Sequence, residues 1–280
     1  MEHGVVTRNP DELEWPEFDS CFYEVKSVAG KPSDPEPNAI NMVSCFADNA
    51  AATGNPDLVP EDDEGRRATR EREYFDWDYI DPSLADYKRG LLDIVEDCVA
   101  VNGDVRLDDV GWPRGEYCHC DRCDAAFAES GFENRGAWRA AIITEFVATV
   151  REHVPGDLYL TVYPDPYPGH LYERSGLDLE ALAEYVDEFV VPIYDMAYST
   201  TYWLEILASA WADRCEELGL PFTVELYAVN VDLDNLLKAA TVAGEYSDRV
   251  LFGYDASQAR AALRRLDAES RSGVDHGSRD

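Results

Sequence analysis

The sequence predicts a single-domain α/β protein with the (β/α)8 architecture of a TIM barrel, and three observations lead to this prediction. Short apolar runs alternate with amphipathic segments, which is the pattern of repeated βα units around a parallel sheet. In the second half of the chain these runs recur about every 30 residues, as one βα unit requires. The length of 280 residues also suits one barrel of this kind.

Eight apolar runs rich in β-branched and aromatic residues are predicted to be strands. They cover residues 4–7, 21–28, 40–46, 105–110, 158–163, 189–194, 222–227 and 250–254. The first half is irregular, because the connections after the first two strands are short and rich in proline. Residues 47–80 then form a long loop after the third strand, and loops of this length are usually functional or flexible.

Apolar residues at helical spacing predict six helices between the later strands. They fall within residues 84–98, 138–150, 179–186, 203–218, 233–240 and 259–266. Asp81 before Pro82 is expected to be the N-cap of the first of these helices. We expect the barrel domain to cover residues 1–268. Residues 269–280 are polar without periodicity and are expected to form a C-terminal tail.

The charge of the chain is strongly unbalanced, with 57 acidic and 24 basic residues and a net charge of -33. Such a protein repels nucleic acids and anionic membranes, so these partners are not expected. Because the acidic residues are scattered along the chain, the composition favours a halophilic protein whose surface is screened by concentrated salt. The alternative is an ordinary acidic protein.

Two further features favour a cytoplasmic protein. No leader-like segment and no window of about 18 apolar residues is present. The seven cysteines are an odd number without the dense spacing of a disulfide framework, so reduced thiols and a metal site are expected.

Acidic residues follow six of the predicted strands, at the end where parallel barrels place their active sites. They are Asp48, the pair Asp108 and Asp109, Asp165, Asp195, Glu225 and Asp255. Asp108 and Glu225 lie within apolar runs, where an acid has to point inward or be paired. Since neighbouring strand residues face opposite sides, only one of Asp108 and Asp109 can point straight into the barrel mouth, and the sequence leaves open which. The other acids also fit the surface of a very acidic chain.

Aromatic residues accompany these acids, and their flat faces suit sugar rings, although aromatic residues are also common in cores. A carbohydrate or another small molecule is therefore the expected ligand. Two opposed carboxylates are the minimal apparatus for glycoside cleavage: one protonates the leaving oxygen, and the other attacks the sugar or activates water. The predicted substrate-binding residues are Asp48, Trp112, Tyr163, Asp165, Tyr194, Asp195, Tyr227 and Asp255.

A cluster of cysteines follows the fourth predicted strand. Cys118, Cys120 and Cys123 lie within six residues, and three thiolates so close together can bind one soft metal ion. A closed structural zinc site is predicted, with Cys45 as the leading candidate for the fourth ligand and Cys21 and His119 behind it. The competing interpretation is a redox pair of Cys120 and Cys123, but the segment does not open a helix after the first strand of a thioredoxin-like unit.

The segment from Leu107 to Phe127 resembles the strand-four region of TIM-barrel glycoside hydrolases. The residues that carry the resemblance are Leu107-Asp108-Asp109-Val110, Trp112-Pro113, Tyr117-Cys118-His119-Cys120-Asp121-Arg122-Cys123 and Phe127. The similarity extends to uncharacterised relatives of these enzymes and to the family-42 β-galactosidases, and in the β-galactosidases such a cysteine cluster holds structural zinc. The resemblance implies Asp108 or Asp109 as acid/base and Glu225 as nucleophile. This chain differs in having Asp-Asp where the β-galactosidases have Asn-Glu, and it has no upstream cysteine near residues 77–79.

The function expected from the sequence is therefore glycoside cleavage by two carboxylates, with Asp108 or Asp109 as the proton donor and Glu225 as nucleophile or base. The main alternative is a non-catalytic carbohydrate-binding barrel with the same zinc site. A metal-dependent hydrolase is disfavoured, because the five histidines are scattered and only His119 and His170 lie near the expected active face.

Overall fold

The computed structural model describes the backbone of residues 1–274 and the side chains of residues 1–268, and it contains a closed parallel barrel. The strand order is β1 to β8, as expected for a TIM barrel. The strands are β1 (Glu2–Thr7), β2 (Ser20–Lys26), β3 (Ile40–Ser44), β4 (Val105–Asp108), β5 (Leu158–Thr161), β6 (Glu188–Pro192), β7 (Phe222–Tyr227) and β8 (Arg249–Gly253). All eight predicted strands are confirmed, although most end earlier than predicted.

The helices alternate with the strands. They are α1 (Asn49–Gly54), α2 (Ala85–Val99), α3 (Asp121–Ser130), α4 (Arg135–His153), α5 (His170–Ser175), α6 (Leu179–Leu182), α7 (Tyr202–Leu218), α8 (Leu233–Ala243) and α9 (Ala256–Val274), with short 3₁₀ turns at Pro10–Glu12 and Pro56–Leu58. The six predicted helices correspond to α2, α4, α6, α7, α8 and α9. The sequence did not predict α1, α3 and α5, which lie in loops after strands.

Two boundary predictions need correction. Leu84, without a side-chain cap, precedes α2, and Asp81 instead accepts hydrogen bonds from Ser83. Helix α9 continues to Val274, into the segment that was expected to be a tail, and residues 275–280 lie outside the described part of the chain.

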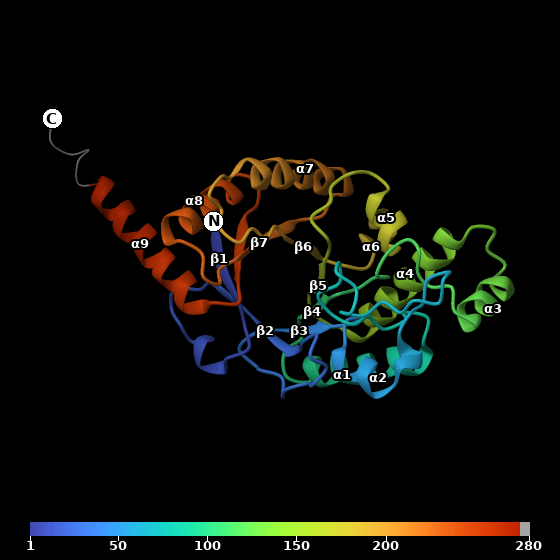
Figure 1. The fold of residues 1–280 in the computed structure, drawn as a ribbon. Coiled ribbons are helices and arrows are strands. Elements are labelled where there is room, and N and C mark those ends of the chain that lie inside the picture. Colours follow the sequence, from blue (N-terminus) through green and yellow to red (C-terminus); the bar gives the residue numbers. More distant parts are fainter. Residues whose placement is uncertain (275–280) are drawn as a thin grey trace. The chain divides into compact units, whose positions relative to one another are not determined.

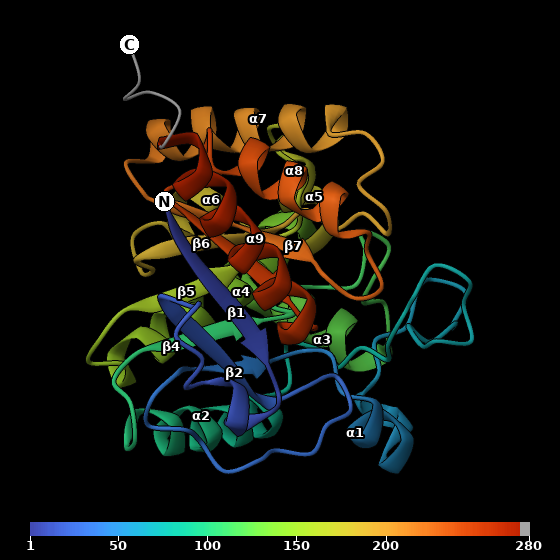
Figure 2. The same cartoon turned by 90° about the vertical axis from the view of Figure 1, so that its left-hand side faces the viewer.

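By its internal contacts the chain forms two compact units, which are described separately: residues 1–23 with 190–280, and residues 24–189. In the first unit β1 pairs with both β2 and β8, and β7 pairs with β8. Helices α7 and α8 pack against β7, and α9 packs along β1 in both views (Figures 1 and 2). Its core contains fully buried side chains such as Val5, Val224 and Phe252.

In the second unit β4 pairs with β3 on one side and with β5 on the other. Helix α2 packs on β3 and β4, and α4 packs against α2, as Figure 1 shows. Met42, Leu107 and Leu160 are fully buried in this core. The long segment after β3 is tied down by a bridge between Ala47 and Tyr79. Within the described residues no helix is both long and apolar enough to cross a membrane.

Candidate active site and metal centre

The end of β4 positions the two aspartates that the sequence analysis selected. Asp108 is the last residue of the strand, and its carboxylate accepts a hydrogen bond from the backbone N–H of Asp109 at 3.0 Å. Asp109 has a left-handed backbone with φ of 52°, so the strand alternation no longer governs its direction. Its carboxyl group accepts a hydrogen bond from the hydroxyl of Ser44 on β3 at 2.6 Å. Both aspartates are half-buried.

The surroundings of Asp109 favour its protonated form. Burial and the neighbouring charge of Asp108 raise the pKa of Asp109 well above its ordinary value, and they outweigh the opposite effects of Ser44 and Lys26. A carboxyl group that retains its proton near neutral pH can act as a general acid. The structure thus gives the two neighbouring aspartates different environments.

Asp48 forms a buried network with Lys26, the last residue of β2. The ammonium group of Lys26 lies 3.3 Å from the Asp48 carboxylate and donates to the carbonyl oxygen of Ser44 at 2.7 Å. The same carboxylate accepts hydrogen bonds from the Tyr87 hydroxyl at 2.9 Å and from the N–H of Ala51 at 2.8 Å, which caps α1. The structure therefore gives Asp48 partners within the fold, while its predicted contact with substrate stays a prediction.

Tyr163 and Asp165 follow β5, as predicted. Burial raises the pKa of Tyr79, and the hydrogen bond between the phenols of Tyr79 and Tyr163 raises the pKa of Tyr79 further. The guanidinium of Arg174 lies over the Tyr163 ring, 4.8 Å from its centroid. Asp165 lies 3.2 Å from Nδ1 of His170 and is partly exposed. Tyr163 and Asp165 are therefore both partly exposed beyond the carboxyl end of β5.

Glu225 lies on β7 and is fully buried, as its apolar sequence context suggested. The hydroxyl of Tyr194, which follows β6, donates a hydrogen bond to its Oε1. Gly253 faces it from β8, and a Cβ at that position would lie 2.8 Å from Glu225 Oε1, so glycine leaves the space that the carboxylate occupies. Tyr227 packs against Tyr194 with ring centroids 5.5 Å apart. Tyr194, which contacts Glu225, and its neighbour Tyr227 thus present partly exposed aromatic surface.

Tyr198 joins the loop after β6 to the end of β7. Its buried hydroxyl donates to the carbonyl oxygen of Ile193 at 2.9 Å and accepts from the N–H of Tyr227 at 2.8 Å. Asp195 is exposed, and its carboxylate accepts from the backbone N–H of Tyr198 at 3.0 Å. Asp195 therefore shapes this loop in the structure, while its predicted contact with substrate stays a prediction.

The end of β8 has an unusual backbone. Tyr254 has φ of 123°, a value that side-chain-bearing residues rarely adopt and that costs conformational energy. The next residue, Asp255, is half-buried and accepts from the N–H of Gln258 at 3.0 Å in the first turn of α9. Asp255 therefore stabilises the start of a helix, and its predicted role in substrate binding stays a prediction.

Trp112 does not offer a face to a substrate, because it is fully buried. Its indole N–H donates to the carbonyl oxygen of Arg139 at 3.2 Å. The guanidinium of Arg139 is itself buried and donates to four carbonyl oxygens, those of residues 114–115 and 173–174, at 2.8 to 3.2 Å. Burial lowers the pKa of Arg139 to about 10, so the group stays charged at neutral pH. The sugar-stacking role expected of Trp112 is replaced by a role in the core.

Three of the predicted metal ligands come together in the second unit. The ligand atoms of Cys118, Cys120, Cys123 and Asp81 all lie within 4.8 Å of one another. Asp81 and two of the thiols are buried, and Cys120 is half-buried. Three thiols and one carboxylate in a closed group are a donor set that zinc accepts.

The surroundings of this cluster fit bound thiolates. The backbone N–H groups of Glu61 and Cys120 point at the sulfur of Cys118 at 3.3 and 3.4 Å. Arg122 donates to Asp81 at 2.6 Å and supplies a compensating positive charge. Cys120 is the N-cap of α3, so the cysteine segment does open a helix, although this helix follows β4 and not a first strand.

The fourth member of the group is therefore Asp81 and not Cys45. Cys45 is fully buried, its thiol contacts the carbonyl oxygen of Val43, and burial raises its pKa. His119 also lies outside the group, with Nδ1 3.8 Å from Asp124. Cys21 is buried, and its thiol contacts the carbonyl oxygen of Leu13.

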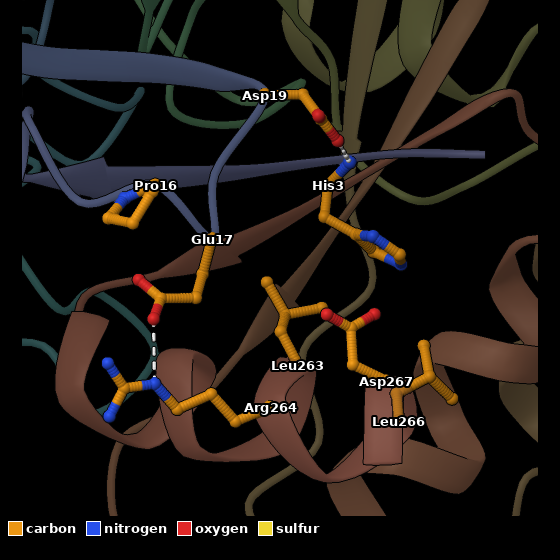
Figure 3. A pocket seen from close by; sticks show the side chains of 8 residues that line it. All are labelled: His3, Pro16, Glu17, Asp19, Leu263, Arg264, Leu266 and Asp267. Carbon is orange, nitrogen blue, oxygen red and sulfur yellow. Dashed lines mark hydrogen bonds and ion pairs between the residues drawn. The ribbon is translucent and has the colours of Figure 1, made fainter. Parts of the chain in front are cut away.

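A hollow of about 370 Å³ lies at the amino end of β1 (Figure 3). His3, Glu17 and Asp19 line it together with side chains of α9, among them Arg264 and Asp267. The carboxylate of Glu17 is paired with Arg264 at 2.6 Å, as the figure shows. Because barrel enzymes react at the carboxyl ends of their strands, this hollow is a poor candidate for the reaction centre.

Sequence reasoning missed several residues that support the site, chiefly Lys26, Ser44, Asp81 and Arg139. One signal was present for Lys26, which is one of only four lysines and lies inside an apolar strand run. A buried charge of this kind requires partners, so it points to an ion pair. Asp81 had no local signal, because its partners are about 40 residues away in sequence.

Comparison with solved structures shows the fold. No protein-family model matches the chain, and no curated protein matches it. The catalytic domain of a β-amylase from Paenibacillus polymyxa aligns with a TM-score of 0.52 and 8% identity, over 90% of this chain and 92% of that chain. A chitinase from Chromobacterium violaceum aligns with a TM-score of 0.52 and 10% identity, over 94% of this chain and 98% of that chain. At these identities the likeness establishes the barrel architecture.

Proposed function

We propose that the protein is a glycoside hydrolase in which Asp109 is the proton donor, and we retain Glu225 as the second carboxylate on the basis of the sequence pattern alone. The observation that carries the proposal is the environment of Asp109. Its half-buried carboxyl group is hydrogen-bonded to Ser44, and its pKa is raised by burial and by Asp108. A raised pKa favours the protonated form, which a general acid needs in order to transfer a proton to the oxygen of a departing alcohol.

Glu225 has a different environment. Its carboxylate accepts a hydrogen bond from Tyr194, whose ring packs against the partly exposed ring of Tyr227. Glu225 is fully buried under this hydrogen bond, so Tyr194 has to move aside before the carboxylate can attack the anomeric carbon or remove a proton from water. The anomeric configuration of the first product distinguishes these two roles: retention indicates a nucleophile, and inversion indicates a base.

Two independent observations support carbohydrate as the ligand. The β-amylase and the chitinase that share the fold are both glycoside hydrolases. The segment from Leu107 to Phe127 also resembles the strand-four region of barrel glycosidases. Strained backbone at Asp109 and Tyr254, both at strand ends, is a further feature that clusters at functional sites.

We also propose that Asp81, Cys118, Cys120 and Cys123 hold a structural zinc ion. Four protein ligands leave no open position, so the ion would stabilise the loop after β4 and take no part in bond cleavage. The group connects this loop to the segment before α2, and the hydrogen bond from the N–H of His119 to the carbonyl oxygen of Glu61, at 2.7 Å, strengthens the same connection.

The experiment that tests the main proposal compares leaving groups. Aryl glycosides with acidic and weakly acidic phenols are assayed with wild type, Asp109→Asn and Glu225→Gln. Asp109→Asn should lose about 10²- to 10⁴-fold in kcat/KM with the weakly acidic phenol but much less with the acidic one, because a good leaving group needs no proton. Glu225→Gln should lose activity with both.

The outcomes of this assay separate the candidate functions. Equal losses of Asp109→Asn with both phenols would remove Asp109 from the role of proton donor. Binding of sugars without turnover of any glycoside would instead support the alternative, a non-catalytic carbohydrate-binding barrel. Asp86→Asn is the matched control, because Asp86 is an exposed aspartate on α2 and should leave the activity unchanged.

A further inference from the structure

A second hollow of about 370 Å³ opens in the unit formed by residues 24–189. Residues 114–116, from the loop after β4, line one part of it, and Asp165, His170, Glu173 and Arg174, which follow β5, line the rest. Both segments follow the carboxyl ends of strands, which is the face where barrel enzymes bind their substrates.

The two arginines of this pocket differ from most arginines of the chain. The guanidinium of Arg114 lies over the ring of Tyr74 at 4.3 Å, and that of Arg174 lies over the ring of Tyr163 at 4.8 Å. Among the described residues neither guanidinium has a hydrogen bond or a carboxylate within ion-pair distance, whereas arginines such as Arg70 and Arg151 are paired with aspartates.

The absence of carboxylate partners is unexpected in a chain with 57 acidic and only 24 basic residues. The pocket itself contains Glu116, Asp165 and Glu173, and none of them is paired with the two arginines. Asp165 is instead engaged with His170 at 3.2 Å. An arginine stacked on an aromatic ring keeps the N–H groups at its edge available for an anion.

The backbone holds both arginines in place. The buried guanidinium of Arg139 donates to the carbonyl oxygens of Arg114 and Arg174, each at 2.8 Å, and also to those of Gly115 and Glu173. One buried cation thus anchors both segments that carry the two pocket arginines. Side chains presented from an anchored backbone lose less freedom when they bind a ligand.

One aromatic side chain, Tyr163, relates the pocket to the candidate proton donor. Tyr163, which supports Arg174, lies within electrostatic range of Asp109 and is hydrogen-bonded to Tyr79. A substrate of the proposed hydrolase that meets Arg174 therefore has to extend from Asp109 into this pocket. This step rests on the proposed function.

We propose that Arg114 and Arg174 bind the carboxylate of an acidic sugar, so that the substrates are glycosides of uronic acids. Planar guanidinium groups match the geometry of a carboxylate and form strong charge-assisted hydrogen bonds with it. A neutral sugar has no anionic group that could pair with the two guanidinium groups of the pocket.

Binding of small methyl glycosides tests this assignment directly. Isothermal titration calorimetry is performed at one fixed ionic strength with methyl glucuronide, methyl glucoside and glucose 6-phosphate. Wild type should bind the glucuronide at least about ten-fold more tightly than the glucoside. Arg114→Gln and Arg174→Gln should each lose about ten-fold for the glucuronide and leave the weaker binding of the glucoside unchanged.

Arg89→Gln is the matched control, because it removes the same charge from an exposed arginine on α2 that does not line the pocket. It should bind the glucuronide like wild type. Equal affinities of wild type for glucuronide and glucoside, or unchanged affinities in both pocket variants with an unchanged Tm, would overturn the proposal. A ten-fold preference for the phosphate over the carboxylate would also reject the assignment to uronic acids.

Glucuronide binding and glycoside turnover, both measured on wild type, separate this proposal from the proposed function. Binding of the glucuronide through the two arginines, without cleavage of any glycoside by wild type, would support the acidic-sugar site and reject the hydrolase. Cleavage of neutral glycosides by a protein that does not bind glucuronides would support the hydrolase and reject the acidic-sugar site.

Discussion

At the scale of single residues, Asp109 shows what a strand pattern can and cannot predict. The pair Asp108 and Asp109 was identifiable from its position at the end of an apolar run. The raised pKa of Asp109 was not predictable, because side-chain alternation assumes that the strand continues. The chain instead turns at Asp109 with φ of 52°, and the Ser44 partner comes from another strand, 65 positions earlier. Both facts depend on tertiary structure.

The raised pKa of Asp109 predicts how stability varies with pH. In the folded protein this pKa lies well above the ordinary value of 3.8, so the folded state retains a proton that the unfolded chain releases. The associated stability is fully present below the unfolded pKa and is lost as the pH rises through the folded pKa. Asp109→Asn should therefore show a smaller decrease of Tm above about pH 4 than wild type, measured by calorimetry at several pH values.

The control for this prediction is Asp86→Asn, which removes an exposed aspartate that is paired only with Arg89 nearby on α2. It should retain the wild-type slope of Tm against pH. A variant Asp109→Asn with the same slope as wild type would show that this carboxyl group is ionised in the folded protein under ordinary conditions.

At the scale of secondary-structure elements, the sequence predicted the existence of the strands better than the residues at which they end. β7 has the predicted bounds, whereas β2, β3, β4, β5 and β6 each end two residues earlier than predicted. The hydrophobic pattern continues past these strand ends because residues such as Val110 and Ile193 are buried outside the sheet. Directly after these strand ends, therefore, apolar residues do not indicate strand structure. The candidate site residues lie in the same places.

The metal centre shows a related limit. The three cysteines were recognisable from local spacing, but the aspartate that completes the group was interpreted as a helix cap. A helix cap and a metal ligand both use the lone pairs of the carboxylate oxygens, so the residue type of Asp81 does not distinguish the two roles. Only the fold brings Asp81 to the cysteines.

The zinc proposal predicts a link between metal content and stability. Elemental analysis of the purified protein should find about one zinc per chain, and Cys120→Ser or Asp81→Asn should lower this content. Cys120→Ser should also lower the free energy of unfolding by roughly 3 kcal/mol or more, because binding of a structural metal contributes to folding. Cys98→Ser, which alters a buried cysteine on α2, is the control and should keep its zinc. Full stability in the presence of a strong chelator would contradict a structural role.

At the scale of the whole molecule, the dominant quantity is the net charge of -33. Electrostatic repulsion between like charges extends over about 10 Å in 0.1 M salt and about 3 Å in 1 M salt. Moving the protein from about 2 M to about 0.1 M sodium chloride should therefore lower its Tm substantially. Potassium chloride at equal ionic strength is the control and should give the same Tm if screening is the cause. A Tm that does not depend on salt would show that the acidic surface is tolerated without screening.

The pairing of β1 with β8 also has a consequence for how the chain is made. The first compact unit combines residues 1–23 with residues 190–280, so its opening strand leaves the ribosome long before most of its partners exist. Until β8 has been synthesised, one edge of β1 stays without its neighbour, and an exposed strand edge promotes aggregation. Chains whose synthesis stops before Arg249 should therefore be targets for chaperones and proteases. The middle unit, residues 24–189, is contiguous and can begin to fold during translation.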